Sequence, residues 1–218
     1  MKLNEGIVPC NKPAGKTSFS LIAAARRRTG IQKIGHAGTL DPFATGVMIL
    51  LIGRDFTRQS GTFLNHDKEY EATVHLGIET TTYDPEGETI AENAYIPPLG
   101  QIEEALGFFQ GTIQQIPPMF SAKKVGGKKL YELARKGVEI ERQPATVTLT
   151  TTLLAYTYPY LQLRISCSKG TYIRSIAHDL GVILKTGAHL CTLTRTRSGP
   201  YTLADCFDGS LLYSSSLE

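Results

Sequence analysis

The residue types best suited to chemistry gather in one glycine-rich loop, Gly35–Gly46, which reads Gly-His-Ala-Gly-Thr-Leu-Asp-Pro-Phe-Ala-Thr-Gly. Its glycines permit unusual backbone angles, and Pro42 biases the residue before it, Asp41, toward an extended conformation. A carboxylate held on a stiff loop between regular elements is well placed for catalysis. The alternative is that Asp41 only accepts hydrogen bonds from the N–H groups of its own loop.

Asp41 has no second carboxylate, metal-ligand cluster, or Ser/His or Cys/His signature beside it in the sequence. A lone carboxylate acts as a nucleophile when a cation keeps it ionised and oriented. Arg174 can supply that cation, because Gly170-Thr171 is typical of a strand-to-helix turn that places Arg174 on the first helical turn. Tyr172 beside it can offer a ring to a nucleobase. A surface arginine and a packing tyrosine are the alternative.

Two further side chains and one motif invite a functional interpretation. Tyr70 begins a strand among charged residues, where a tyrosine usually serves in cross-strand packing. His36 is a lone histidine in a loop, and such a residue more often forms a structural hydrogen bond than takes part in catalysis. The motif Gly15-Lys16-Thr17 resembles the end of a phosphate-binding loop. However, Cys10 stands where that loop needs a glycine, and Pro13 removes an N–H from the phosphate cradle. A nucleotide hydrolase is therefore disfavoured, and stabilisation by ATP or GTP would be needed to restore that interpretation.

The elements that position these residues follow from periodicity and turn signals. Helices are predicted at 19–28, capped by Thr17-Ser18 and ended by Gly30, and at 99–110, 130–136 and 172–185. Strands are predicted at 47–52, 70–78, 145–158, 160–168 and 189–197, and a glycine-tipped basic hairpin at 123–129. With no linker between comparable halves, the pattern predicts one α+β domain with a mixed, largely antiparallel sheet.

The net charge of +3 conceals a strong asymmetry. Residues 1–60 hold 9 Lys and Arg against 3 Asp and Glu, residues 61–120 hold 1 against 10, and residues 121–218 hold 13 against 7. Two basic thirds around an acidic one suit a polyanion such as nucleic acid, although a solubilising surface gives the same counts.

The four cysteines lie far apart, and no signal peptide or long apolar run is present, so we expect a reduced, cytoplasmic protein.

Several segments, in order along the chain, together resemble the TruB family of tRNA pseudouridine synthases. They are Asn11–Ser18, the loop Gly35–Gly46, Lys68–Ala72, Pro117–Lys123 leading into Leu130-Tyr131-Glu132, and Ser168–Arg174. The resemblance implies the pseudouridine synthase fold and isomerisation of the T-loop uridine at position 55 of tRNA to pseudouridine. No metal or redox cofactor, membrane or obligate protein partner is implied; the expected partner is the T arm of tRNA.

The resemblance also implies roles for single residues. Asp41 matches the family's catalytic aspartate, and Arg174 is expected to pair with it. Tyr70 is expected to pack on the target base, His36 to fill the space that the flipped base leaves, and Tyr172 and Leu193 to line the uracil pocket. The basic segment 123–129 resembles a loop that closes over RNA in the family. Asn11, Lys16 and Phe120 depart from the usual Asp, Met and Tyr of the family, and modest effects are expected.

The resemblance predicts a catalytic domain over residues 1–200 and a short tail over 201–218, without the PUA-type RNA-binding domain usual in bacterial members. Affinity for tRNA is then expected to come chiefly from the T arm. The rival interpretation is an RNA-binding or chaperone protein that keeps the fold without the activity. The presence of Asp41, Tyr70 and Arg174 favours the enzyme.

Overall fold

The computed structural model describes residues 4–121, 123–134 and 136–214. The predicted helix at 130–136 includes residue 135, and the predicted tail at 201–218 includes residues 215–218, all of which lie outside the described ranges. The predicted hairpin at 123–129 begins next to residue 122, which also lies outside them. The chain divides into two compact units, residues 1–71 with 193–218, and residues 72–192. Two strands, β4 (Lys68–Leu76) and β12 (Ala188–Ser198), belong partly to each unit. Continuous strands at the boundary explain why the sequence shows no linker there.

The predicted α+β class, with a mixed and largely antiparallel sheet, is confirmed. Ten strands form the main sheet. Eight of them lie in the order β14 (Phe207–Asp208), β1 (Gly6–Lys12), β3 (Thr45–Ile52), β12, β4, β11 (Tyr160–Cys167), β10 (Ala145–Thr157) and β7 (Gln110–Gln115). The other two are β2 (Ile34–Ala37), which pairs with β3, and β13 (Tyr201–Thr202), which pairs with β12. Antiparallel pairs predominate among those with a described register, while β1–β14 and β3–β12 are parallel. The predicted boundary at residue 200 stays a prediction.

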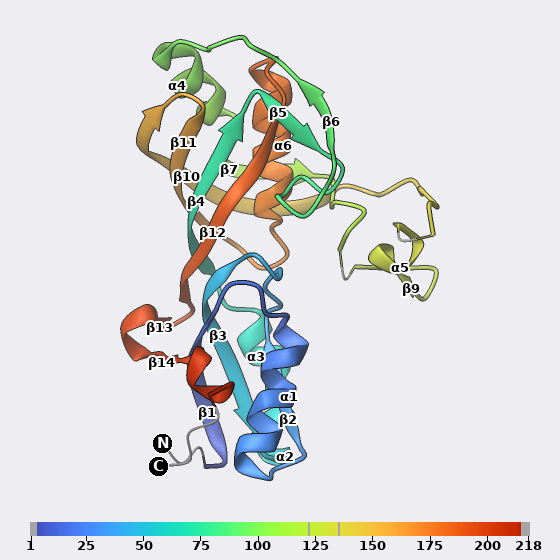
Figure 1. Cartoon of the computed structure of the whole chain (residues 1–218), viewed down its shortest axis with the longest axis vertical. Coiled ribbons are helices and arrows are strands. Elements are labelled where there is room, and N and C mark those ends of the chain that lie inside the picture. Colours follow the sequence, from blue (N-terminus) through green and yellow to red (C-terminus); the bar gives the residue numbers. More distant parts are fainter. Residues whose placement is uncertain (1–3, 122, 135, 215–218) are drawn as a thin grey trace. The chain divides into compact units, whose positions relative to one another are not determined.

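The first unit is built around the buried strand β3 (Thr45–Ile52), from which Val47 to Ile52 are all fully buried. Its other regular elements are β1 (Gly6–Lys12), α1 (Ser18–Thr29), β2 (Ile34–Ala37), α2 (Arg54–Thr57), α3 (Ser60–Leu64), β13 (Tyr201–Thr202), η1 (Leu203–Asp205), β14 (Phe207–Asp208) and η2 (Gly209–Leu212). Helix α1 lies beside β2 (Figure 1). One face of β3 contributes Val47, Ile49 and Leu51 to a core that includes Phe63.

Helix α1 begins and ends where the sequence predicts. The Thr17 side chain accepts a hydrogen bond from Ser20 N at 2.9 Å, which satisfies one of the free N–H groups of the first turn. Gly30 ends the helix in the left-handed conformation, with φ of 73°, and donates to Arg26 O at 2.9 Å. The motif that resembles a phosphate-binding loop is therefore the capped start of an amphipathic helix.

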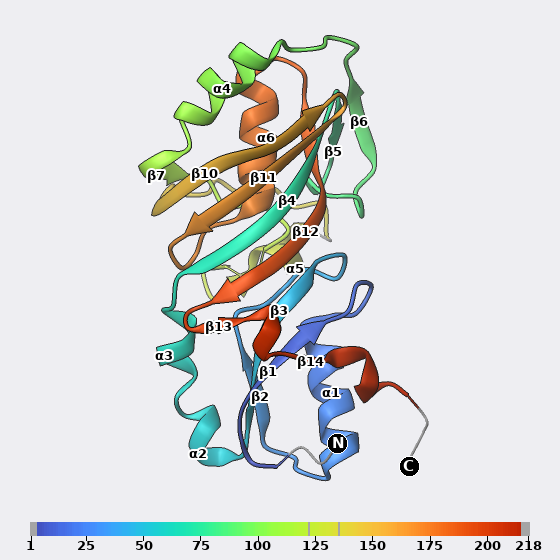
Figure 2. The ribbon, with the colours of Figure 1, turned by 90° about the vertical axis from the view of Figure 1, so that its left-hand side faces the viewer.

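The second unit contains the remaining elements. They are β5 (Ile78–Thr80), β6 (Thr89–Glu92), α4 (Leu99–Gly107), β7 (Gln110–Gln115), β8 (Lys124–Val125), β9 (Lys128–Lys129), α5 (Leu130–Ala134), β10 (Ala145–Thr157), β11 (Tyr160–Cys167) and α6 (Ile173–Ile183). Helices α4 and α6 lie on one side of strands β10 and β11 (Figure 2). Strands β8 and β9 form the predicted hairpin, whose tip, Gly126-Gly127, has positive φ at both residues.

Candidate active site

The loop that carries Asp41 connects β2 to β3 and is fastened on both sides of the carboxylate. Before Asp41, the Ser18 hydroxyl donates to Leu40 O and accepts from Leu40 N, each at 3.0 Å. After it, Pro42 O accepts from Gly15 N at 2.9 Å. Asp41 itself is half-buried, and its carbonyl accepts from Ala44 N at 3.2 Å. The start of α1 thus holds the backbone next to Asp41.

Lys12, which the sequence analysis did not single out, also holds this loop in place. Its side chain is fully buried, and its ammonium donates to Pro42 O at 3.0 Å, Pro13 O at 2.9 Å and Lys16 O at 2.6 Å. An ammonium removed from water is tolerated only when its protons find such acceptors. Lys12 therefore ties the N-terminal segment to the residue that follows Asp41.

Asn11, one of the departures from the usual family sequence, also supports the loop. Its side-chain oxygen accepts from Gly46 N at 3.1 Å. An amide oxygen and a carboxylate oxygen can both accept this bond. The contact explains why we expect the exchange of Asp for Asn to have a modest effect.

His36 lies in β2, opposite Leu50 of β3, and its Nε2 is 3.3 Å from the Thr39 hydroxyl. Burial, and secondarily the positive charge of Arg195, lower the pKa of His36 below its ordinary value of 6.5. Both effects disfavour the charged ring. At neutral pH, His36 is therefore an uncharged imidazole.

Tyr70 and Leu193 also belong to the first unit, together with Asp41 and His36. Tyr70 in β4 and Leu193 in β12 are both buried. Next to them, the Thr196 hydroxyl of β12 donates to the Glu69 carboxylate of β4 at 2.9 Å. Four of the six residues predicted for the site therefore come from one compact unit.

Arg174 and Tyr172 belong to the second unit, at the start of α6. The Arg174 guanidinium forms an ion pair with Asp84 at 3.2 Å, and both side chains are almost completely buried. It also donates to Thr82 O at 3.2 Å and to Phe120 O at 2.8 Å. The buried carboxylate that Arg174 contacts in the structure is thus Asp84, which the sequence analysis did not propose, and its pairing with Asp41 stays a prediction.

Asp84, which the sequence analysis did not single out, lies in the turn that follows β5. That turn aims the carboxylate, because Asp84 Oδ1 accepts from Glu86 N at 3.0 Å as well as from the Thr82 hydroxyl. Its other oxygen is left for Arg174. An aspartate before a proline is a common turn signal, so the sequence alone gave no reason to select it.

Tyr172 caps α6 at its N-terminus in an extended conformation. Its backbone is held by the buried side chain of Gln115, which accepts from Tyr172 N at 2.8 Å and donates to Tyr172 O at 3.0 Å. This two-bond contact fixes the direction in which α6 begins, and therefore the position of Arg174 two residues later.

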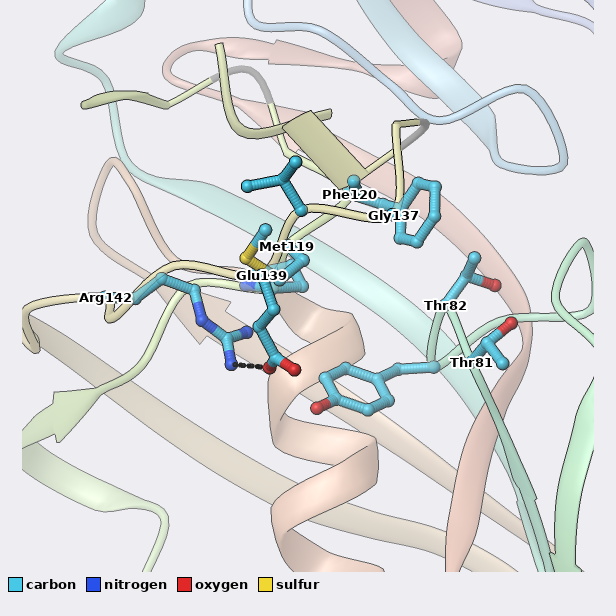
Figure 3. A pocket seen from close by; sticks show the side chains of 11 residues that line it. Thr81, Thr82, Met119, Phe120, Gly137, Glu139 and Arg142 are labelled. Atoms are coloured by element: carbon cyan, nitrogen blue, oxygen red, sulfur yellow. Dashed lines mark hydrogen bonds and ion pairs between the residues drawn. The ribbon is translucent and has the colours of Figure 1, made fainter. Parts of the chain in front are cut away.

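A pocket of about 240 Å³ is lined in part by two residues whose carbonyls bind Arg174 (Figure 3). Its wall includes Thr82 and Phe120, whose carbonyls bind Arg174, together with Met119. Arg142 and Glu139, 3.3 Å apart, contribute an ion pair. Thr82 and Phe120 therefore line the pocket and also bind the arginine of the Arg174–Asp84 pair.

The described residues show neither a cluster of metal ligands nor a membrane-spanning helix. They contain no group of three or more His, Cys, Asp or Glu side chains arranged to hold a metal ion. In the same part of the chain, no helix has both the length and the apolar character needed to span a membrane.

Comparison with known protein families matches residues 26–173 to the N-terminal domain of TruB family pseudouridylate synthases and residues 174–214 to the C-terminal domain of tRNA pseudouridylate synthase B. The chain belongs to the TruB family. Within it, the chain is 60% identical over 209 residues to tRNA pseudouridine synthase B of Protochlamydia amoebophila, covering 96% of this chain and 80% of the relative. It is 57% identical over 212 residues to the enzyme of the same name from Chlamydia pneumoniae, with 97% and 90% covered.

Solved structures support the same fold. A chain from the crystal structure of a Cbf5-Nop10-Gar1 complex matches with a TM-score of 0.71 and 29% identity, covering 90% of this chain and 50% of that one. An archaeal box H/ACA sRNP Nop10-Cbf5 complex gives a TM-score of 0.69 with 27% identity, covering 95% of this chain and 52% of that one. The TruB family chain is thus a pseudouridine synthase by sequence and by fold, and its activity is that of an isomerase.

Proposed function

We propose that this TruB family chain converts the uridine at position 55, in the T loop of tRNA, to pseudouridine, with Asp41 as the nucleophile. The reaction breaks the bond between ribose C1′ and uracil N1, turns the base, and joins C1′ to C5. The proton on C5 is lost and N1 gains one, so that atoms and charge balance without an oxidant or reductant. The family and the relatives' shared name support this activity.

The observation that carries the proposal is the fixation of the Asp41 loop. The residue before Asp41 is held by Ser18, and the residue after it is held by Lys12 and Gly15. A nucleophile gains rate when its position is set before the substrate arrives, because orientation entropy is then not lost in the reaction step. A loop whose only purpose was a turn would not need a buried lysine.

Arg174 is proposed to keep Asp41 ionised, as the family pattern implies. A guanidinium presents five N–H donors in one plane and can contact more than one carboxylate, so the ion pair between Arg174 and Asp84 is compatible with this role. Asp84 then serves as the residue that orients Arg174. Tyr70, Tyr172 and Leu193 are proposed to receive the base, which must leave the stack of the folded T loop at a cost of roughly a few kcal/mol.

His36 is proposed to enter the space that the target base vacates. An uncharged ring suits this role, because stacking against nucleobases does not then require removal of water from a cation. The lowered pKa of His36 supports the assignment. We place the enzyme in the cytoplasm, where its tRNA substrate is found.

The proposal is tested with a T-arm hairpin that carries tritium at C5 of uridine 55 only. The wild-type protein should release one tritium per molecule of RNA to the solvent. A matched hairpin labelled only at a neighbouring uridine is the control, and it should retain its label. Binding without release from uridine 55 would contradict the enzyme and would support the RNA chaperone instead.

A further inference from the structure

Arg195 is a buried arginine with no part in the proposed reaction, yet it contacts both ends of the Asp41 loop. It lies in β12, which runs parallel to β3 with Arg195 opposite Gly46. Its side chain is 1% exposed. The guanidinium donates from Nη2 to Gly38 O at 2.9 Å and from Nε to Val47 O at 2.6 Å. Gly38 directly follows β2, and Val47 lies in β3. The planar guanidinium of Arg195 therefore bridges the two ends of the loop.

Two glycines of the loop make room for this arginine. A Cβ at Gly38 would lie 3.3 Å from Arg195 Nη1, and a Cβ at Gly46 would lie 2.2 Å from Arg195 O. Both residues have positive φ, of 82° and 109°. The glycines of this motif therefore seat the arginine as well as shaping the turn.

The charge on Arg195 is unusual for a buried side chain. Within the described part of the chain, its hydrogen bonds go to the two carbonyl oxygens and it takes part in none of the ion pairs. Burying a charged group without a counter-ion is costly unless its donors are well matched. A neutral side chain would fill this space at a lower cost, and a lysine would bring the same charge in a more strongly hydrated form, but neither offers two rigid charged donors in one plane.

We propose that Arg195 is a positioning residue for the isomerisation, whose guanidinium holds Gly38 and Val47 at a fixed separation and thereby fixes the loop that carries Asp41. The inference rests on the proposed role of Asp41. The neighbouring contact between the Thr45 and Thr194 hydroxyls, at 2.9 Å, fastens the same part of the loop to β12. The positive charge of Arg195 also contributes to the lowered pKa of His36. The electrostatic effect of Arg195 therefore reaches a second residue of the same loop.

The test compares Arg195→Lys and Arg195→Gln with Arg197→Gln as a matched control. Arg197 is the next arginine in β12 and donates to Gly199 O, away from the loop. For each folded variant, the single-turnover rate at saturating tRNA and the tRNA dissociation constant are measured. Because a misplacement of about 1 Å can reduce a rate about 100-fold, both Arg195 variants should lose at least about tenfold in rate, with tRNA affinity unchanged. Arg197→Gln should match the wild type.

Titration of His36 by NMR separates positioning from general damage to the fold. Removing a nearby positive charge raises the pKa of His36, so Arg195→Gln should show this rise. Arg195→Lys should keep the wild-type value while losing rate, because it retains the charge and loses the planar fork. A uniform loss of affinity and stability would not produce this pattern.

Wild-type single-turnover rates in folded Arg195→Lys and Arg195→Gln would overturn the proposal. Failure of both variants to fold would overturn it too, since it would assign Arg195 to the folding of the first unit. Asp41→Asn, measured in parallel, distinguishes the two hypotheses. If Asp41→Asn is inactive while the Arg195 variants are fully active, only the role of Arg195 fails; if Asp41→Asn is active, the proposed nucleophile fails.

Discussion

Asp84→Asn is the substitution that tests most sharply how Arg174 is held. Asparagine has nearly the same shape and can still accept from Glu86 N, so the turn keeps its hydrogen bond. What it loses is the negative charge 3.2 Å from the Arg174 guanidinium. Arg174 would keep its hydrogen bonds to the carbonyls of Thr82 and Phe120 but lose its ion pair with Asp84.

The expected cost is large because both partners are buried. Their side chains are 5% and 4% exposed, and breaking such a pair by removing one charge typically costs about 3–5 kcal/mol. In a chain of this size, 1 kcal/mol corresponds to roughly 2–4 °C in Tm, so Tm should fall by about 6–20 °C. Replacing both partners should cost less than the two single changes together, because the double variant removes both charges of the buried pair and not only one of them.

The assay is thermal and urea unfolding of the wild type, Asp84→Asn, Arg174→Met and the double variant. Asp55→Asn is the matched control, since Asp55 pairs with Arg58 at 3.6 Å on the surface, with both side chains largely exposed. That pair should be worth less than about 1 kcal/mol. If Asp84→Asn unfolded with a free energy within about 0.5 kcal/mol of the wild type, or if the double variant were simply additive, the reasoning would be refuted.

Two further predictions follow from the loop. Because the pKa of His36 is lowered in the folded state, the unfolded chain binds a proton that the folded chain does not as pH falls below about 6.5, so the free energy of unfolding should decrease toward acid pH. His36→Gln should weaken this dependence in urea unfolding at about pH 7.5 and 5.5, and identical curves for both proteins would contradict it. Gly46→Ala should destabilise by at least about 3 kcal/mol, through strain at positive φ and a clash with the Arg195 backbone. Its control, Gly100→Ala, meets open space and should be neutral or slightly stabilising; equal stability of the two variants would exclude the clash.

The elements with strong local signals were predictable from the sequence. Helix α1 has a threonine cap and a terminal glycine, and β3 is an uninterrupted apolar run, so both are found within one or two residues of their predicted ends. The paired glycines of the basic hairpin form its tip as predicted. In each case the cause of the structure lies within the segment itself, as capping, apolar burial or positive φ.

The strands β1 and β2 were missed because their signals are weak or mixed. Strand β1 contains Pro9, which normally argues against a strand, but its seven residues pair with β3 over their whole length. Strand β2 is only four residues long, and three of these residues, Gly35–Ala37, also belong to the loop motif. Both owe their conformation to β3, a partner distant in sequence.

The supporting residues of the site were less predictable than its candidate nucleophile. Asp41 stands in a distinctive motif, whereas Lys12 and Arg195 look like two basic residues among many that could contact RNA. Their burial, and the carbonyl oxygens that they bind, depend on contacts with the Asp41 loop. Asp84 pairs with Arg174 across about ninety residues of sequence, which turn chemistry alone does not reveal.

The central claim is that the Asp41 carboxylate is the nucleophile. The measurement that tests this claim most directly is the release of tritium from uridine 55 by the Asp41→Asn variant. The amide retains the shape of the side chain but not its nucleophilic charge. The account predicts no release above background from the folded variant, with tRNA affinity retained and with Asp55→Asn fully active. Release by Asp41→Asn at a rate within about tenfold of the wild type would contradict it.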